Sequence, residues 1–152
     1  NLRVNAGLTL LESEYGFFLN VDGLRPGPPF QNEGNPLNNA PETSFNFGVT
    51  YDTALSNGGS LSVGLDTSYR SRVFFREFGL EEDSQDAYVI VNINANWTSG
   101  DGDYAARLFV NNVTDEQHVT GMYGLQGTYG RQGTWNMPRQ VGFEVTKFFG
   151  AR

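Results

Sequence analysis

The 152-residue sequence contains no cysteine and a single histidine, His118. Without cysteine, the chain cannot form disulfide bonds or use a thiolate nucleophile. One histidine cannot supply a zinc site built on several histidines, and no GxSxG motif places a nucleophile beside oxyanion donors. We therefore expect no catalytic residues, no metal site and no cofactor, and we predict that the chain is not an enzyme.

Clustered positive charge and long apolar runs are also missing from the sequence. The 10 basic and 17 acidic residues give a net charge of −7, and the basic residues form no run. No nucleic acid partner is expected, because phosphate binding needs clustered lysine and arginine. No stretch reaches the roughly 18 apolar residues of a membrane-spanning helix. A nucleic-acid-binding module and a helical membrane protein are both excluded.

Glycine (19), phenylalanine (12) and tyrosine (7) are abundant instead, and apolar residues alternate with polar ones over six segments. Period-two alternation is typical of half-buried β-strands with one apolar face. The sequence therefore predicts an all-β fold, an antiparallel up-and-down meander of six strands without a convincing helix. The expected strands are residues 2–10, 45–52, 61–70, 87–97, 104–111 and 140–146.

The connections between these segments alternate strictly in length. TALSNGGS (53–60) and SGDGD (99–103) are tight and rich in turn residues. The other three connections, residues 11–43, 71–86 and 113–137, exceed the 12–15 residues that are common in compact domains. In an up-and-down sheet, all long loops then emerge at one end and all short turns at the other.

Aromatic residues lie at both ends of the apolar face. Tyr51, Trp97 and Tyr104 lie beside the short turns, and Phe45 and Tyr69 lie at the long-loop end. Aromatic residues that flank an apolar band are typical of outer-membrane barrels. Long external loops and short turns on the other side are a second property of such barrels.

The opposite face carries the polar side chains that a water-filled barrel interior would need. Asn92, Asn94 and Asn96 form one row, with Asp66 nearby. We predict that the following residues face the lumen: Arg70, Arg107, Asn92 and Asn94. Alternation alone fits a soluble sheet equally well, with the polar face in solvent. A passive porin-like barrel and a soluble β-sandwich that binds carbohydrate therefore remain alternatives.

The last third of the chain resembles the end of a TonB-dependent outer-membrane receptor of the iron-complex type. In FVNNVTDEQHV, residues 112–115 match the Asn-Leu-Thr/Phe-Asp-like motif that closes the penultimate strand of that family. In MPRQVGFEVTKFFG, Pro138-Arg139 open the last strand and Phe148-Phe149 close it. The chain departs from the pattern at Lys147, where an aromatic residue is often found, and in continuing through residues 150–152. SYRSRVFF (68–75) and QDAYVIVNINANW (85–97) are also similar to strands of these receptors.

The resemblance implies a barrel of about 22 strands around a plug domain. Residues 1–152 would be its C-terminal six strands, with the plug and the TonB box outside this sequence, which begins without methionine inside an alternating segment. The implied function is active import of a ferric siderophore or similar scarce nutrient across the outer membrane of a Gram-negative bacterium. The implied partners are outer-membrane lipid, the rest of the barrel and plug, the TonB complex and a small-molecule iron chelate.

Six strands cannot close into a barrel, since single-chain barrels begin at about eight strands. An open sheet in a membrane leaves unpaired edge groups in lipid, at several kcal/mol each. We therefore expect that the segment alone is not a functional pore.

The long loops carry the candidate ligand-binding residues, because aromatic faces and guanidinium groups suit catecholate, carboxylate or hydroxamate chelates. Packing of loop against loop is the competing interpretation. His118 is expected to be a solvated loop histidine rather than a catalytic base, and EEDSQD (81–86) is expected to be surface charge. At Asn111-Asn112 we expect the strand to leave the hydrocarbon, and at residues 114–116 we expect the final loop to begin with Asx-type turn chemistry. The candidate ligand contacts are Phe17, Phe18, Arg72, Phe74, Phe75, Arg76, His118, Tyr123, Tyr129, Arg131 and Trp135.

Overall fold

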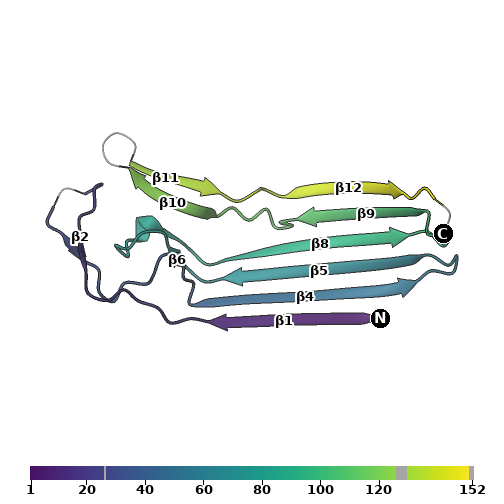
Figure 1. Cartoon of the computed structure of the whole chain (residues 1–152), viewed down its shortest axis with the longest axis horizontal. Coiled ribbons are helices and arrows are strands. Elements are labelled where there is room, and N and C mark those ends of the chain that lie inside the picture. The colour runs from purple at the N-terminus through teal and green to yellow at the C-terminus, as the bar shows by residue number, and fades with distance from the viewer. Residues whose placement is uncertain (26, 126–129, 151–152) are drawn as a thin grey trace.

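A six-stranded antiparallel sheet forms the main body of the protein (Figure 1). The computed structural model describes residues 1–25, 27–125 and 130–150. The strands follow one another across the sheet in chain order, so the predicted up-and-down meander is confirmed. They are β1 (Leu2–Leu10), β4 (Thr43–Ala54), β5 (Ser60–Arg70), β8 (Tyr88–Thr98), β9 (Tyr104–Asn111) and β12 (Gln140–Lys147).

The loops contain small elements that the alternation did not predict. Two of the three small hairpins pair strands of only two residues, which are too short to show a periodic pattern. A three-residue 3-10 turn, η1 (Glu81–Asp83), is the helical element of the described residues, and none of their helices could cross a membrane. The hairpins are β2 (Leu19–Asn20) with β3 (Phe30–Gln31), β6 (Val73–Phe74) with β7 (Ser84–Gln85), and β10 (Val119–Leu125) with β11 (Gly130–Trp135).

Long loops and short turns lie at opposite ends of the sheet, as expected. Figure 1 shows β2, β6, β10 and β11 beyond one end of the six strands, and the tight turns with the N-terminus at the other. In the β4–β5 turn, Leu55 N–H donates to the Gly59 carbonyl at 2.8 Å, and Gly58 has a φ of +83°. This left-handed conformation is readily adopted by glycine. We call the two ends the loop end and the turn end.

One face of the sheet is apolar across all six strands. A single cross-strand row contains only aliphatic side chains, because the register aligns the apolar position of every strand. That row is Val4, Val49, Leu65, Ile93, Val110 and Val141. Many side chains of this face are exposed, for example Leu8 at 63% and Phe143 at 71%.

No second sheet among the described residues covers the apolar face, as a β-sandwich would require. The buried hydrophobic side chains of the described residues are Val73, Phe75 and Phe78, and all three lie in a loop. Soluble proteins rarely expose contiguous apolar patches above a few hundred Å². The apolar face of the sheet therefore needs an apolar environment from outside this chain.

The opposite face is polar, and the four residues expected to face a lumen lie on it by strand alternation. Arg107 is the cross-strand neighbour of both Asn96 and Glu144, and Asn94 is opposite Gly64. Ile90 and Phe109 are apolar side chains on this face, and the Arg107 guanidinium lies 5.0 Å from the centre of the Phe109 ring. Two faces of opposite polarity are thus built into one layer.

The aromatic residues mark both ends of the apolar face. At the loop end, Phe45 and Tyr69 are direct cross-strand neighbours on β4 and β5. At the turn end, Trp97 is opposite Leu61, and Tyr104 is opposite Lys147, whose Nζ lies 5.1 Å from the centre of the tyrosine ring. The apolar band therefore lies between two aromatic borders, as the sequence indicated.

Candidate ligand-binding site

The loop end contains a small hydrophobic core. Phe78 is 6% exposed and its ring packs edge-to-face on Phe30, with centroids 5.4 Å apart. Phe75, a predicted ligand contact, is 7% exposed and belongs to this core. Phe18 and Phe74 are half-buried, and Phe18 packs on Tyr15 at 5.2 Å. The Phe30–Phe78 contact joins two loops, as in the competing interpretation of the loop residues, whereas Phe18 and Tyr15 pack within one loop.

A cluster of charges around two buried aspartates connects all three long loops. Arg76 donates from Nη1 to Asp83 Oδ2 at 3.0 Å and from Nη2 to Asp22 Oδ1. Arg131 on β11 donates from Nε to Asp83 Oδ1 at 2.6 Å and from Nη2 to Glu82 at 3.2 Å. A further pair joins Arg25 to the same glutamate. We call these residues the loop ion cluster: Asp22, Arg25, Arg76, Glu82, Asp83 and Arg131.

Two aspartates of the loop ion cluster are fully enclosed, with Asp22 1% and Asp83 0% exposed. The prediction that residues 81–86 are surface charge is therefore wrong for Asp83. The cause is tertiary, because arginines from distant parts of the chain compensate the carboxylates in the interior. Arg76 and Arg131 were predicted as ligand contacts, but their guanidinium groups donate hydrogen bonds to these aspartates.

The environment of Asp22 favours its charged form. Burial alone would raise the pKa of this carboxyl, but hydrogen bonds from Arg76 and from the Leu24 N–H (3.0 Å), together with the charges of Arg76 and Arg131, outweigh it. The pKa of Asp22 is therefore held below its ordinary value.

Arg72 lies at the surface and is also paired. It donates to Glu81 at 2.9 Å and to Asp86, and the hydrogen bond and charge of Asp86 raise the pKa of the guanidinium. All three arginines predicted as ligand contacts thus have carboxylate partners within the loops.

The stretch after β9 is held by side-chain amides. Asn112 has a φ of +52° and is 5% exposed. Its Oδ1 accepts from Glu116 N–H at 2.9 Å, and its Nδ2 donates to the carbonyls of Glu116 (2.9 Å) and Met137 (3.2 Å). The strand exit expected at Asn111-Asn112 is present, since β9 ends at Asn111 and the Asn112 amide bonds backbone groups of the following loop.

His118 is buried at 6% exposure, so the prediction of a solvated loop histidine is wrong. Its ring stacks on Tyr88 of β8, with centroids 3.7 Å apart and planes 14° from parallel. Its backbone N–H donates to Asn136 Oδ1 at 2.9 Å, while the buried Nδ1 has no hydrogen-bond partner among the described residues. Burial lowers the pKa of His118, Glu116 raises it and Arg70 lowers it, with a net decrease. The imidazole is therefore neutral near pH 7.

A polar hollow of about 360 Å³ lies beside His118, at the loop end of the polar face. Sequence reasoning placed Arg70 on this face but did not bring His118 to it, because the histidine is 48 positions along the chain from Arg70. The Arg70 side chain is exposed and makes no ion pair or hydrogen bond within the described ranges. The lining residues are Ser44, Asn46, Ser68, Tyr69, Arg70, Tyr88, Ile90 and His118.

Three other predicted contacts remain available at the surface. Phe17 is 71%, Tyr123 50% and Trp135 65% exposed, and Tyr123 donates its hydroxyl to Gln132 at 2.8 Å. Tyr129 lies outside the described residues. These exposed rings, one on the 11–43 loop and two on the β10–β11 hairpin, can offer stacking surfaces to a ligand.

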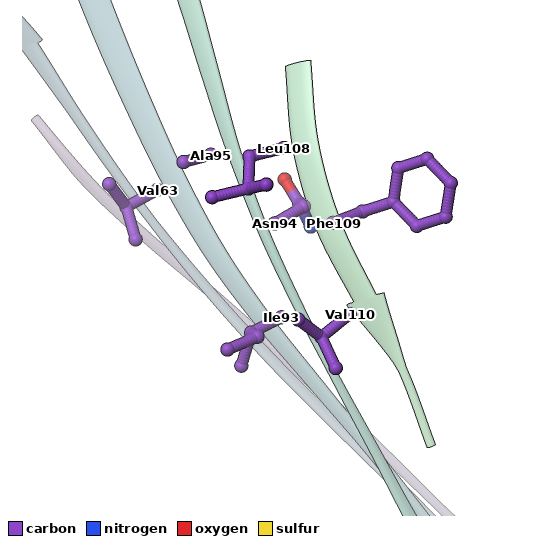
Figure 2. A pocket seen from close by; sticks show the side chains of 7 residues that line it. All are labelled: Val63, Ile93, Asn94, Ala95, Leu108, Phe109 and Val110. Carbon is purple, nitrogen blue, oxygen red and sulfur yellow. The ribbon is translucent and has the colours of Figure 1, made fainter. Parts of the chain in front are cut away.

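A second hollow, on the apolar face, lacks the polar groups that a ligand site needs. Figure 2 shows this hollow of about 120 Å³ over β5, β8 and β9, with the Leu108 side chain and the Phe109 ring on opposite sides of β9. Specific ligand pockets combine apolar walls with a few convergent polar groups. This hollow has aliphatic walls from Val63, Ile93 and Leu108 and is better suited to a hydrocarbon chain.

Comparison with known proteins links this arrangement to one family. The family model described as TonB dependent receptor-like, beta-barrel, matches residues 1–113. The chain is also similar to the crystal structure of the ferric yersiniabactin uptake receptor FyuA from Yersinia pestis, with a TM-score of 0.67 and 20% sequence identity. The similarity covers 78% of this chain and 18% of that one, and at this identity it supports the fold alone. No curated protein sequence matches the chain.

Proposed function

Because the chain belongs to the TonB-dependent receptor β-barrel family, we propose that residues 1–152 form the C-terminal six strands of an outer-membrane active transporter. The barrels of this family are outer-membrane proteins of Gram-negative bacteria, and the family consists of receptors and transporters rather than enzymes. The imported substrate is a ferric siderophore or a similar scarce nutrient. Uptake is energised by the TonB complex.

The observation that carries the proposal is the single sheet with one apolar and one polar face. The row Val4 to Val141 is aliphatic in all six strands, while the opposite face carries Arg70 and Arg107. In a barrel wall, the first face contacts outer-membrane lipid and the second faces the plug and the aqueous interior. The outer edges of β1 and β12, which are unpaired within the described residues, then pair with the rest of the barrel.

The ligand in this proposal approaches from the loop end. Phe17, Tyr123 and Trp135 supply exposed rings there, and the loop ion cluster holds the two loops that carry them in one arrangement through the 71–86 loop. Preorganised loops bind with a smaller loss of conformational entropy. The loop ion cluster thus acts on ligand binding through positioning.

Uptake of labelled iron by cells carrying the full-length receptor tests the proposal. Cells are given ferric chelates of the catecholate, hydroxamate and carboxylate classes, and a strain without the receptor is the control. We expect saturable uptake of at least one chelate that stops when TonB is removed or the proton gradient is collapsed. Uptake that continues unchanged without TonB supports the passive porin-like alternative and contradicts the proposal.

A further inference from the structure

The polar hollow at the loop end combines two neighbouring rows of the sheet with one side chain from a loop. Ser44, Arg70 and Tyr88 are cross-strand neighbours in the first row, and Asn46 and Ser68 are neighbours in the second. His118 closes one side by stacking on Tyr88. The stacked rings restrict Tyr88, so the wall beside Arg70 is preformed.

Arg70 differs from the other arginines of the described residues, because each of them has a carboxylate or an aromatic ring as its partner. Arg3, Arg25, Arg72, Arg76, Arg131 and Arg139 form ion pairs, and Arg107 lies over Phe109. Glu116 is close enough to act on His118 but forms no ion pair with Arg70. The Arg70 guanidinium therefore presents its donors to the hollow without a compensating anion.

We propose that this hollow binds a carboxylate group, with Arg70 as its cationic anchor and Ser44, Asn46 and Ser68 as additional hydrogen-bond donors. The planar fork of a guanidinium matches the two oxygens of a carboxylate. Arg70 is the one charged side chain among the lining residues, so the hollow balances a single negative charge. A phosphate group carries about 1.5 to 2 negative charges near pH 7 and would remain partly uncompensated.

The carboxylate has two possible sources, and both supply the same chemistry. It belongs either to the imported chelate, in which case the inference rests on the proposed function and narrows the substrate class, or to an acidic side chain of the receptor's own plug. Either source places a negative charge on the polar face at the loop end.

The test uses the full-length receptor in detergent, with citrate as the probe and an arginine-specific dicarbonyl reagent. The modification rates of Arg70 and Arg107 are measured by peptide mass spectrometry, with and without citrate and with and without the plug. If the chelate is the source, citrate slows modification of Arg70 several-fold and leaves Arg107 unchanged. If the plug is the source, Arg70 is protected without citrate and becomes reactive when the plug is deleted.

Binding of ferric citrate to two variants completes the experiment. With the chelate as source, Arg70→Gln weakens binding about tenfold, as expected for loss of one charged hydrogen-bonding partner, and the matched variant Arg107→Gln does not. With the plug as source, both variants bind like wild type. If the dicarbonyl reagent modifies Arg70 at the same rate under all four conditions, the proposed carboxylate site is overturned.

If the wild-type receptor binds no ferric chelate, only the proposed function is contradicted, because the protection of Arg70 is measured independently.

Discussion

Asn112 shows how a single side-chain amide fixes the exit from the sheet. Asn112→Ala removes three hydrogen bonds of 2.9, 2.9 and 3.2 Å and leaves alanine in a left-handed conformation that asparagine tolerates better. The expected cost is about 2 kcal/mol, or roughly a 30-fold increase in local opening. Hydrogen exchange at the amides of Glu116 and His118 in the full-length receptor measures this opening.

The neighbouring residue provides the control for that experiment. Asn111 is exposed and its side chain forms no hydrogen bond within the described residues, so Asn111→Ala should leave exchange unchanged. Equal protection in wild type and Asn112→Ala would contradict the role assigned to the Asn112 amide.

The lowered pKa of Asp22 predicts how the stability of the loops changes in acid. Its pKa in the closed loops is lower than its ordinary value of 3.8, so the open loops bind more protons than the closed ones. The stabilisation is complete above the ordinary pKa and is lost as the pH falls through the lowered one. We therefore expect limited proteolysis of the loops to increase below about pH 4, and to remain slow between pH 5 and 7.

Substitution separates this effect from general acid unfolding. Asp22→Asn leaves Arg76 without one of its two carboxylates, so the loops should be cleaved faster already at pH 7 and with a weaker pH dependence. Asp86→Asn, which removes a surface carboxylate paired with Arg72, should behave almost like wild type. An identical acid profile for wild type and Asp22→Asn would refute the assignment.

The residues that sequence reasoning misplaced are polar groups whose partners lie far away in the chain. Asp83 was expected in solvent, and its partner Arg131 is 48 positions away. His118 was expected in solvent too, but it is covered by Tyr88 of another strand. Local composition indicates that a segment is a loop, whereas the ion pairs and ring contacts that bury its side chains depend on tertiary structure.

Among the elements, the pair β9 and β12 contains a packing constraint of its own. Gly142 lies opposite Phe109 on the polar face, and a Cβ at Gly142 would overlap the phenylalanine ring. Gly142→Ala should displace the ring and destabilise the pairing by about 1–3 kcal/mol. Urea unfolding of the full-length receptor in lipid vesicles measures the effect.

A second substitution shows whether the ring is the cause. Gly142→Ala combined with Phe109→Ala should be less destabilising than the sum of the two single changes, because the overlap is absent. Gly7→Ala on β1 is the matched control, since a Cβ at Gly7 has no neighbour within 4 Å. Additive effects of the two substitutions would show that Phe109 does not cover Gly142.

The six long strands were predictable because each repeats its pattern over many residues. Each of the six strands of the main sheet has one apolar and one mainly polar side, and the tight turns at 55–59 and 99–103 set the register. The hairpins β2–β3 and β6–β7 carry no such signal, because two residues cannot define a period. For the loops, the sequence indicated which aromatic and arginine residues could contact a ligand. It could not indicate which of them are exposed, because exposure depends on how the loops pack.

For the whole molecule, the decisive property is that both faces of the sheet require partners outside this chain. The apolar face is uncovered, the polar face carries Arg70 without a counter-charge, and the outer edges of β1 and β12 have no neighbour among the described residues. In the wall of a larger barrel each of these surfaces has a partner: lipid contacts the apolar face, the plug faces the polar face, and adjacent strands pair with the outer edges.

Oxygen accessibility along β4 in the full-length receptor in lipid vesicles tests this account most directly. Single spin-labelled cysteines are placed at positions 46 to 51 of a cysteine-free receptor, and residues 1–152 contain no cysteine that has to be replaced. Lipid dissolves more oxygen than water does, so accessibility should alternate, with maxima at 47, 49 and 51 and minima at 46, 48 and 50. Uniform accessibility, or maxima at 46, 48 and 50, would contradict a membrane-spanning sheet in this orientation.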